Sequence, residues 1–136
     1  MSRSWQREQW ILDRRIEEFR ELLTALAEAF AVAMKLHAEV VIESERLREF
    51  MNGHANALRV IRSRIFIVEE VAQFNIELRW AEAGARYQRT LDVPHFATVF
   101  NEMRIQIVGA ARITQAYIHR PSYKRIFKHK DSTRAQ

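Results

Sequence analysis

Apolar residues recur along the first third of the chain in alternating steps of four and three. The series starts at Trp5 and ends at Met51, and eleven of its fourteen positions are apolar. The exceptions are Gln9, His37 and Ser44. A repeat of about 3.5 residues held over this length is typical of a long helix with a coiled-coil seam. No glycine or proline precedes Asn52-Gly53, so we predict one helix over about 4–51, with a kink near 31–36 as the alternative.

The next segment, 55–83, carries two apolar stripes side by side and is predicted to form a second helix that ends near Gly84. A helix with so wide an apolar face touches two neighbours and lies in the middle of the packing. Residues Phe74 to Trp80 alternate strictly between apolar and polar, as a half-buried strand would. No turn residue joins such a strand to a partner, so the helix is the preferred interpretation.

A third helix is predicted over 93–119. Asp92 stands near its N-cap and Pro94 in its first turn, which is a typical helix start. Short connections make consecutive helices antiparallel neighbours. The predicted fold is therefore all-α, an elongated antiparallel bundle or coiled coil of three long helices, or of four if the first is kinked. Residues 1–119 would form a single helical domain, followed by a basic tail over 120–136.

Unequal helix lengths leave the start of the first predicted helix without cover. Folded back, the other two helices reach it only as far as about Leu22 or Leu23. The uncovered stripe would comprise Trp5, Leu12, Ile16 and Phe19. An exposed apolar patch of this kind is usually an interface, so we predict self-association through these residues, with a dimer favoured. A kinked first helix that closes a four-helix monomer is the alternative.

Composition excludes several classes of protein. The 136 residues contain no cysteine, three glycines and two prolines. The missing cysteines exclude disulfide-stapled modules, thiolate metal sites and cysteine nucleophiles. Glycine is too rare for Rossmann or P-loop chemistry, and neither motif occurs. We find no secretory signal and no uninterrupted apolar segment of spanning length, and we therefore expect a soluble, cytoplasmic protein.

The formal net charge of +5 belongs to the end of the chain. Residues 119–136 hold six basic residues and one acidic residue, and the preceding residues are neutral as a whole. The predicted polyanion-binding residues are Arg120, Lys124, Arg125, Lys128 and Lys130. Aromatic and aliphatic side chains stand between them, which suits single-stranded nucleic acid or anionic lipid headgroups. A terminus that only increases solubility is the alternative.

Candidate metal ligands and histidine sites are few. We expect no metal and no cofactor, because the chain has no Glu-x-x-His motif. The adjacent pairs Glu17-Glu18 and Glu69-Glu70 diverge around a helix and are interpreted as solvent-facing. His37 in the seam is interpreted as a packed histidine, and His54 beside Gly53 as a helix cap.

The spacing Arg-x(4–6)-His, found in the HEPN superfamily of helical ribonucleases, fits Arg112 and His119. Segments 48–54 and 89–95 fit it as well, and about two chance matches are expected from so many arginines and histidines. The sequence therefore favours a non-enzymatic interaction or scaffold module that self-associates and docks a polyanion or an acidic partner through its tail. The alternatives are an HEPN-like ribonuclease or toxin using Arg112 and His119, and a helical protein bound peripherally to a membrane.

Overall fold

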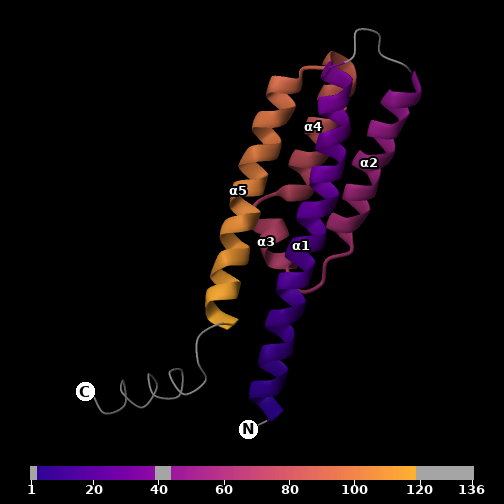
Figure 1. Ribbon diagram of the computed structural model, residues 1–136. Helices are drawn as coiled ribbons and strands as arrows, with labels where there is room; N and C mark the ends of the chain where they lie inside the picture. Colours follow the sequence, from indigo (N-terminus) through magenta and orange to yellow (C-terminus); the bar gives the residue numbers. More distant parts are fainter. Residues whose placement is uncertain (1–2, 39–43, 119–136) are drawn as a thin grey trace.

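The regular structure of the described chain is entirely helical in the computed structural model, which confirms the predicted all-α class (Figure 1). The structure describes residues 3–38 and 44–118. Within these ranges lie five helices and no strand. The helices are α1 (Arg3–Ala38), α2 (Ser44–Arg62), α3 (Val68–Gln73), α4 (Ile76–Thr90) and α5 (Val93–Ile118).

The prediction of one helix over 4–51 is wrong, because α1 ends at Ala38 and the chain reverses before α2 begins at Ser44. The two helices lie side by side and run in opposite directions (Figure 1). Leu36 near the end of α1 and Phe50 in α2 are both buried, since both helices face the same core. Neither residue belongs to the apolar repeat. The repeat identified core-facing positions in α1, at Phe19, Leu26 and Ala33, but its member Met51 in α2 is 44% exposed, and it concealed the reversal between the two helices. The alternative kink near 31–36 is also wrong, because α1 is continuous there.

The predicted helix end at Asn52-Gly53 lies inside α2. A Cβ added at Gly53 would lie 3.5 Å from the Ala29 Cα, which is an ordinary contact distance. Gly53 therefore marks a close approach of α2 to α1, and alanine would also fit at this position.

The second predicted helix, 55–83, is divided between the end of α2, α3 and the start of α4. One division is the turn between α2 and α3, and the other is Asn75, which adopts a left-handed conformation with φ 54°. Asparagine tolerates this conformation better than most residues. The strand alternative is wrong, because α4 begins at Ile76. Gly84, expected at a helix end, lies inside α4, which continues to Thr90.

The third predicted helix agrees with α5, which spans Val93–Ile118. Asp92 accepts a hydrogen bond from the His95 backbone N–H at 3.1 Å and so caps the first turn. Pro94 lies in that turn, where its missing N–H removes no helical hydrogen bond. Local sequence signals were sufficient here because the cap uses only neighbouring residues.

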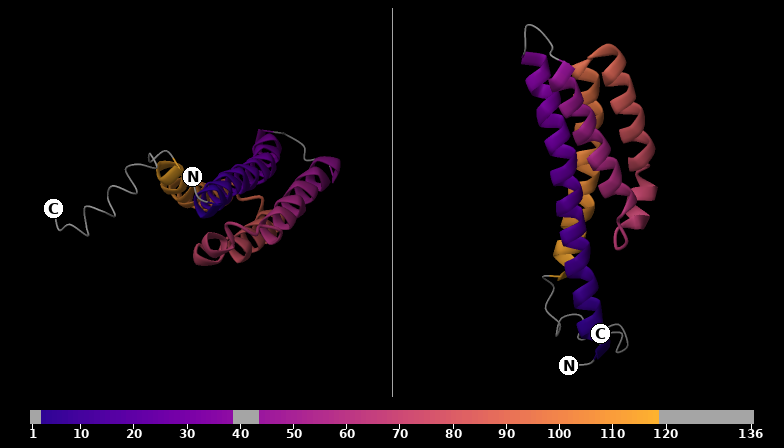
Figure 2. Two further views of the ribbon diagram at one scale, coloured as in Figure 1. Left: turned by 90° about the horizontal axis from the view of Figure 1, so that it is seen from below. Right: turned by 90° about the vertical axis from the view of Figure 1, so that its right-hand side faces the viewer.

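Four long helices enclose one core, which is the number given by the four-helix alternative, although the predicted first helix is interrupted after Ala38 and not at a kink near 31–36. α1 contacts α2 and α5, and α4 also contacts α2 and α5. α1 and α5 project past the ends of α2 and α4, where the short α3 lies nearby (Figures 1 and 2). The result is a four-helix bundle that continues at one end as an α1–α5 pair.

His54 and Trp80 join α2 to α4 inside the core. The His54 Nε2–H donates to the Trp80 carbonyl at 2.7 Å, and the Trp80 Nε1–H donates to the His54 carbonyl at 3.1 Å. The two rings stack with centroids 5.0 Å apart. Gly84 makes room for the imidazole, because a Cβ there would lie 1.9 Å from the His54 Nε2. The interpretation of His54 as a helix cap is therefore wrong.

Aromatic contacts extend this link to the other two long helices. Phe96 of α5 lies 5.5 Å from the Trp80 ring, measured between centroids. Phe30 of α1 stacks on Phe100 of α5 with centroids 4.3 Å apart. The Tyr87 hydroxyl of α4 donates to a carbonyl of α1 at 3.2 Å. Aromatic residues thus join all four long helices in one core.

We expect the substitution Gly84→Ala to lower the free energy of unfolding by about 1–3 kcal/mol, because the new Cβ displaces the His54 ring and breaks its buried hydrogen bond. Gly53→Ala is the matched control, since its Cβ meets only ordinary contacts and alanine favours a helix. Urea denaturation followed by circular dichroism measures both. Equal stability of the two variants would contradict the role assigned to Gly84.

Candidate interaction site

The stripe predicted for self-association is largely covered within the chain. Phe19 is 1% exposed and belongs to the core, so the prediction that it contacts a partner is wrong. The other three predicted residues, Trp5, Leu12 and Ile16, are half-buried. α5 continues to Ile118 and lies alongside α1. It therefore covers a part of α1 that the predicted helix lengths left without a neighbour.

A different apolar stripe is exposed on α5. Ile105 and Ile113 are 63% and 75% exposed, although large aliphatic side chains are usually buried. Both line a hollow of about 360 Å³ whose other walls include α3 and Arg15 of α1. Gly109 lies midway between the two isoleucines and lines the same hollow.

Gly109 has no packing role within the described chain. A Cβ at this position would meet no atom within 4 Å, whereas a Cβ at Gly84 would clash with His54. Glycine inside a helix costs about 0.5–1 kcal/mol relative to alanine. Its effect here is to leave the α5 backbone open between two exposed isoleucines, so that another backbone is able to approach closely.

The predicted polyanion-binding residues lie outside the described residues. They are Arg120, Lys124, Arg125, Lys128 and Lys130, and their role stays a prediction. α5 ends at Ile118, at the end of the bundle where α1 begins (Figure 1). Arg3 and Arg7 are exposed there. Glu8 and Asp13 are exposed on the same part of α1, so this end of the described chain carries charges of both signs.

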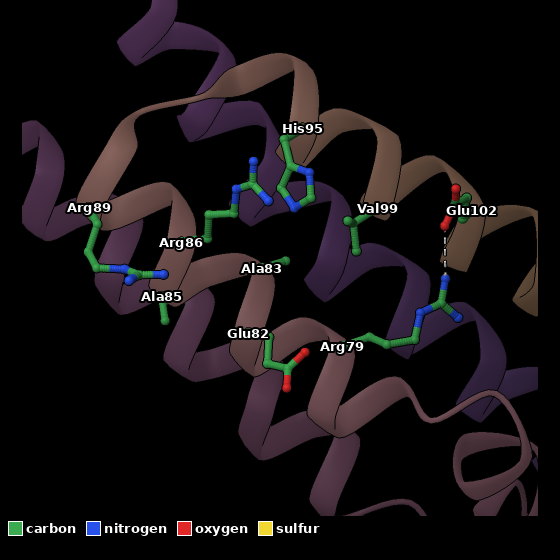
Figure 3. Close-up of a pocket in the computed structure, with 9 residues that line it drawn as sticks. All are labelled: Arg79, Glu82, Ala83, Ala85, Arg86, Arg89, His95, Val99 and Glu102. Atoms are coloured by element: carbon green, nitrogen blue, oxygen red, sulfur yellow. Dashed lines mark hydrogen bonds and ion pairs between the residues drawn. The ribbon is translucent and has the colours of Figure 1, made fainter.

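A second hollow, of about 490 Å³, lies between α4 and α5 and is lined by arginines (Figure 3). Arg79 pairs with Glu102 at 3.4 Å, and Arg86 pairs with Asp92 at 3.8 Å. Glu82 adds a further carboxylate to the lining. Because acidic side chains offset the arginines, this hollow carries less net positive charge than its arginines suggest.

The ribonuclease hypothesis gains no site from the described residues. Arg112 is exposed on α5, and His119 lies outside them. His37, interpreted as a packed histidine, is exposed near the end of α1. Within the described ranges, no group of three or more acidic or histidine side chains could hold a metal ion, and no helix is long and apolar enough to cross a membrane.

Two charged residues of α1 hold the turn between α2 and α3, and the sequence analysis missed both. Glu18, interpreted as solvent-facing, is 4% exposed, and its carboxylate accepts the backbone N–H groups of Ile65 at 3.1 Å and Phe66 at 2.9 Å. Arg15 donates to the Phe66 carbonyl at 2.6 Å and pairs with Glu70, also interpreted as solvent-facing. No local signal reveals this role, because Glu18 and Ile65 are 47 residues apart in the sequence.

Comparisons with known proteins add no relative. No family model, no curated protein sequence and no solved structure matches the chain. Function must therefore be inferred from the surfaces of the bundle.

We expect the free energy of unfolding to fall as the pH decreases below about 6.5, because burial lowers the pKa of His54 below its ordinary value of 6.5, an effect that its hydrogen bond to Trp80 only partly opposes. Below this pH, His54 binds a proton more readily in the unfolded chain than in the folded chain. The contribution of the neutral His54 to the free energy of unfolding is therefore complete above about pH 6.5 and is lost as the pH decreases further. Urea denaturation at several pH values tests the effect. His54→Gln should remove this part of the pH dependence, and His37→Gln, at an exposed histidine, should keep it. An equal dependence in the wild type and His54→Gln would contradict the prediction.

Proposed function

We propose that the protein is a non-enzymatic helical interaction module that forms a dimer through the exposed stripe of α5. The observation that carries this proposal is the arrangement of Ile105, Gly109 and Ile113 along one hollow, with the isoleucines 63% and 75% exposed. This stripe takes the place of the α1 residues from which self-association was predicted.

The stripe has the symmetry that a two-fold contact requires. Each isoleucine is four residues from Gly109. In an antiparallel pair of α5 helices that cross at Gly109, Ile105 of one copy lies against Ile113 of the other, and the same contact repeats across the axis. Burying an isoleucine fully contributes about 1.5–3 kcal/mol, and the open backbone at Gly109 lets the two helices approach.

The proposal also gives the basic tail a docking role. The tail carries the net charge of +5, and Arg3 and Arg7 lie at the end of the bundle where it begins. Attraction of such charges to a polyanion or an acidic partner acts over about 10 Å at moderate salt and weakens as salt rises. The module would thus combine a dimer contact on α5 with electrostatic docking at one end of the bundle.

We expect the wild-type chain to have the mass of a dimer at micromolar concentration, and Ile113→Glu to raise the dimer dissociation constant at least about tenfold, because it places two carboxylates in an apolar contact. Light scattering after size exclusion measures the mass. Gln115→Glu is the matched control, an exposed position on the same helix outside the stripe. A monomeric wild type, or a dimer unaffected by Ile113→Glu, would refute the proposed contact.

We expect the full chain to be retained on heparin, and a variant with glutamine at Arg120, Lys124, Arg125, Lys128 and Lys130 to elute at a much lower salt concentration. The control replaces Arg86 and Arg89 by glutamine, since these exposed arginines lie near the end of α4 at the opposite end of the bundle (Figure 1). Equal retention of both variants would exclude docking through the tail.

A further inference from the structure

A basic and aromatic face lies at the start of α1. Arg3, Arg7, Trp10 and Arg14 follow one another in steps of four, three and four, which places them along one face of the helix. Trp10 is 55% exposed, and Arg3 and Arg7 are exposed as well. Arg14 forms an ion pair with Glu17 at 2.8 Å, and the two side chains are 40% and 52% exposed. This face therefore presents an indole beside Arg3 and Arg7, whereas Glu17 offsets the charge of Arg14.

The turn between α2 and α3 adds aliphatic side chains to this face. Trp10 packs edge-on against Phe66 with ring centroids 5.5 Å apart, and the Arg14 guanidinium lies 5.8 Å from the same ring. Ile65, adjacent to Phe66 in the chain, and Val68, two residues after it, are 72% and 55% exposed. Trp10 and Arg14 thus contact Phe66 of this turn. We use the term α1-turn patch for Arg3, Arg7, Trp10 and Arg14 together with Ile65 and Val68.

The turn that carries Ile65 is held in place by buried charge. The Glu18 carboxylate accepts the backbone N–H groups of Ile65 and Phe66, and Arg15 donates to the Phe66 carbonyl at 2.6 Å. Turning Ile65 inward would break these hydrogen bonds and leave the 4% exposed Glu18 carboxylate unpaired. The protein therefore maintains an exposed isoleucine at this position, although its own core does not use it.

We infer that the α1-turn patch docks on the surface of an anionic lipid bilayer. Arginine side chains pair with phosphate and carboxylate headgroups, and tryptophan favours the interface between headgroups and acyl chains. Ile65 and Val68 would then enter the acyl boundary, where their exposed surface leaves water. Nucleic acid also offers phosphates, and the Trp10 indole is able to stack on a base, but nucleic acid has no apolar phase to receive the aliphatic side chains of Ile65 and Val68.

This inference rests on the proposed polyanion docking and names anionic lipid as its source. The 18 residues that follow Ile118 carry a charge of +5 and start at the end of the bundle where Arg3 and Arg7 lie (Figure 1). Basic segments of this kind are attracted to anionic lipid surfaces. The tail would bring the bundle to the bilayer, and the α1-turn patch would fix which face of the bundle meets it.

Flotation of the full chain with lipid vesicles tests the inference. We expect the wild type to float with vesicles of phosphatidylcholine containing about one quarter phosphatidylserine, and to stay behind with phosphatidylcholine alone. The double variant Ile65→Ser/Val68→Ser, which changes only exposed side chains, should lose at least about tenfold of the binding to anionic vesicles. Tryptophan emission should shift to the blue on binding, and Trp10→Phe should reduce that shift, because Trp80 is already buried.

The matched control is Leu78→Ser, which changes a 52% exposed aliphatic residue of α4 outside both proposed surfaces and should leave vesicle binding intact. Unchanged binding of Ile65→Ser/Val68→Ser, or equal binding to neutral vesicles, would overturn the inference. Retention on heparin or RNA without vesicle binding would overturn it too, while leaving the proposed polyanion docking in place. A chain that binds neither heparin nor vesicles would refute the proposed polyanion docking as well as the docking on anionic lipid.

Discussion

The reciprocal hydrogen bonds between His54 and Trp80 fix the position of α2 relative to α4. Each ring donates to the backbone carbonyl of the other residue, at 2.7 and 3.1 Å, so sliding either helix would leave two buried polar pairs unsatisfied. An unsatisfied buried group costs about 1–3 kcal/mol, which is a large part of the stability of a small domain. The link exists only because Gly84 leaves space for the imidazole. Phe96 then contacts the Trp80 ring and joins α5 to the same centre.

With α2 and α4 fixed, the longer helices determine which surfaces stay exposed. α2 ends at Arg62 and α4 begins at Ile76, so α1 and α5 continue past them as a pair. The six residues of α3 are too few to cover that pair. Two apolar surfaces remain, the α5 stripe and the α1-turn patch, and they share no residue. A dimer formed through the α5 stripe would carry two copies of the α1-turn patch, and two copies would strengthen binding to an anionic bilayer through multivalency.

The local signals of the sequence predicted the presence of helices correctly, but they located some helix ends correctly and others wrongly. Asp92 and Pro94 located the start of α5 correctly, because a helix cap involves only adjacent residues. Gly53 and Gly84 were expected at helix ends, but both lie inside helices, where a neighbouring helix approaches. At the candidate sites, the sequence predicted an exposed apolar stripe and placed it on α1. The structure leaves Trp5, Leu12 and Ile16 half-buried and exposes Ile105 and Ile113 of α5, since coverage depends on how far each helix extends in space.

The sequence by itself determined the all-α class, core-facing positions of α1 such as Leu26 and Ala33, and the concentration of positive charge in residues 119–136. Only the tertiary structure decided that the apolar repeat is divided between α1 and α2, and that Glu18 is buried. It also decided that Ile105, Ile113, Ile65 and Val68 stay exposed. The physical reason is that periodicity records which side of a helix is apolar, whereas burial depends on which other helix reaches that side, and that helix is often distant in the sequence.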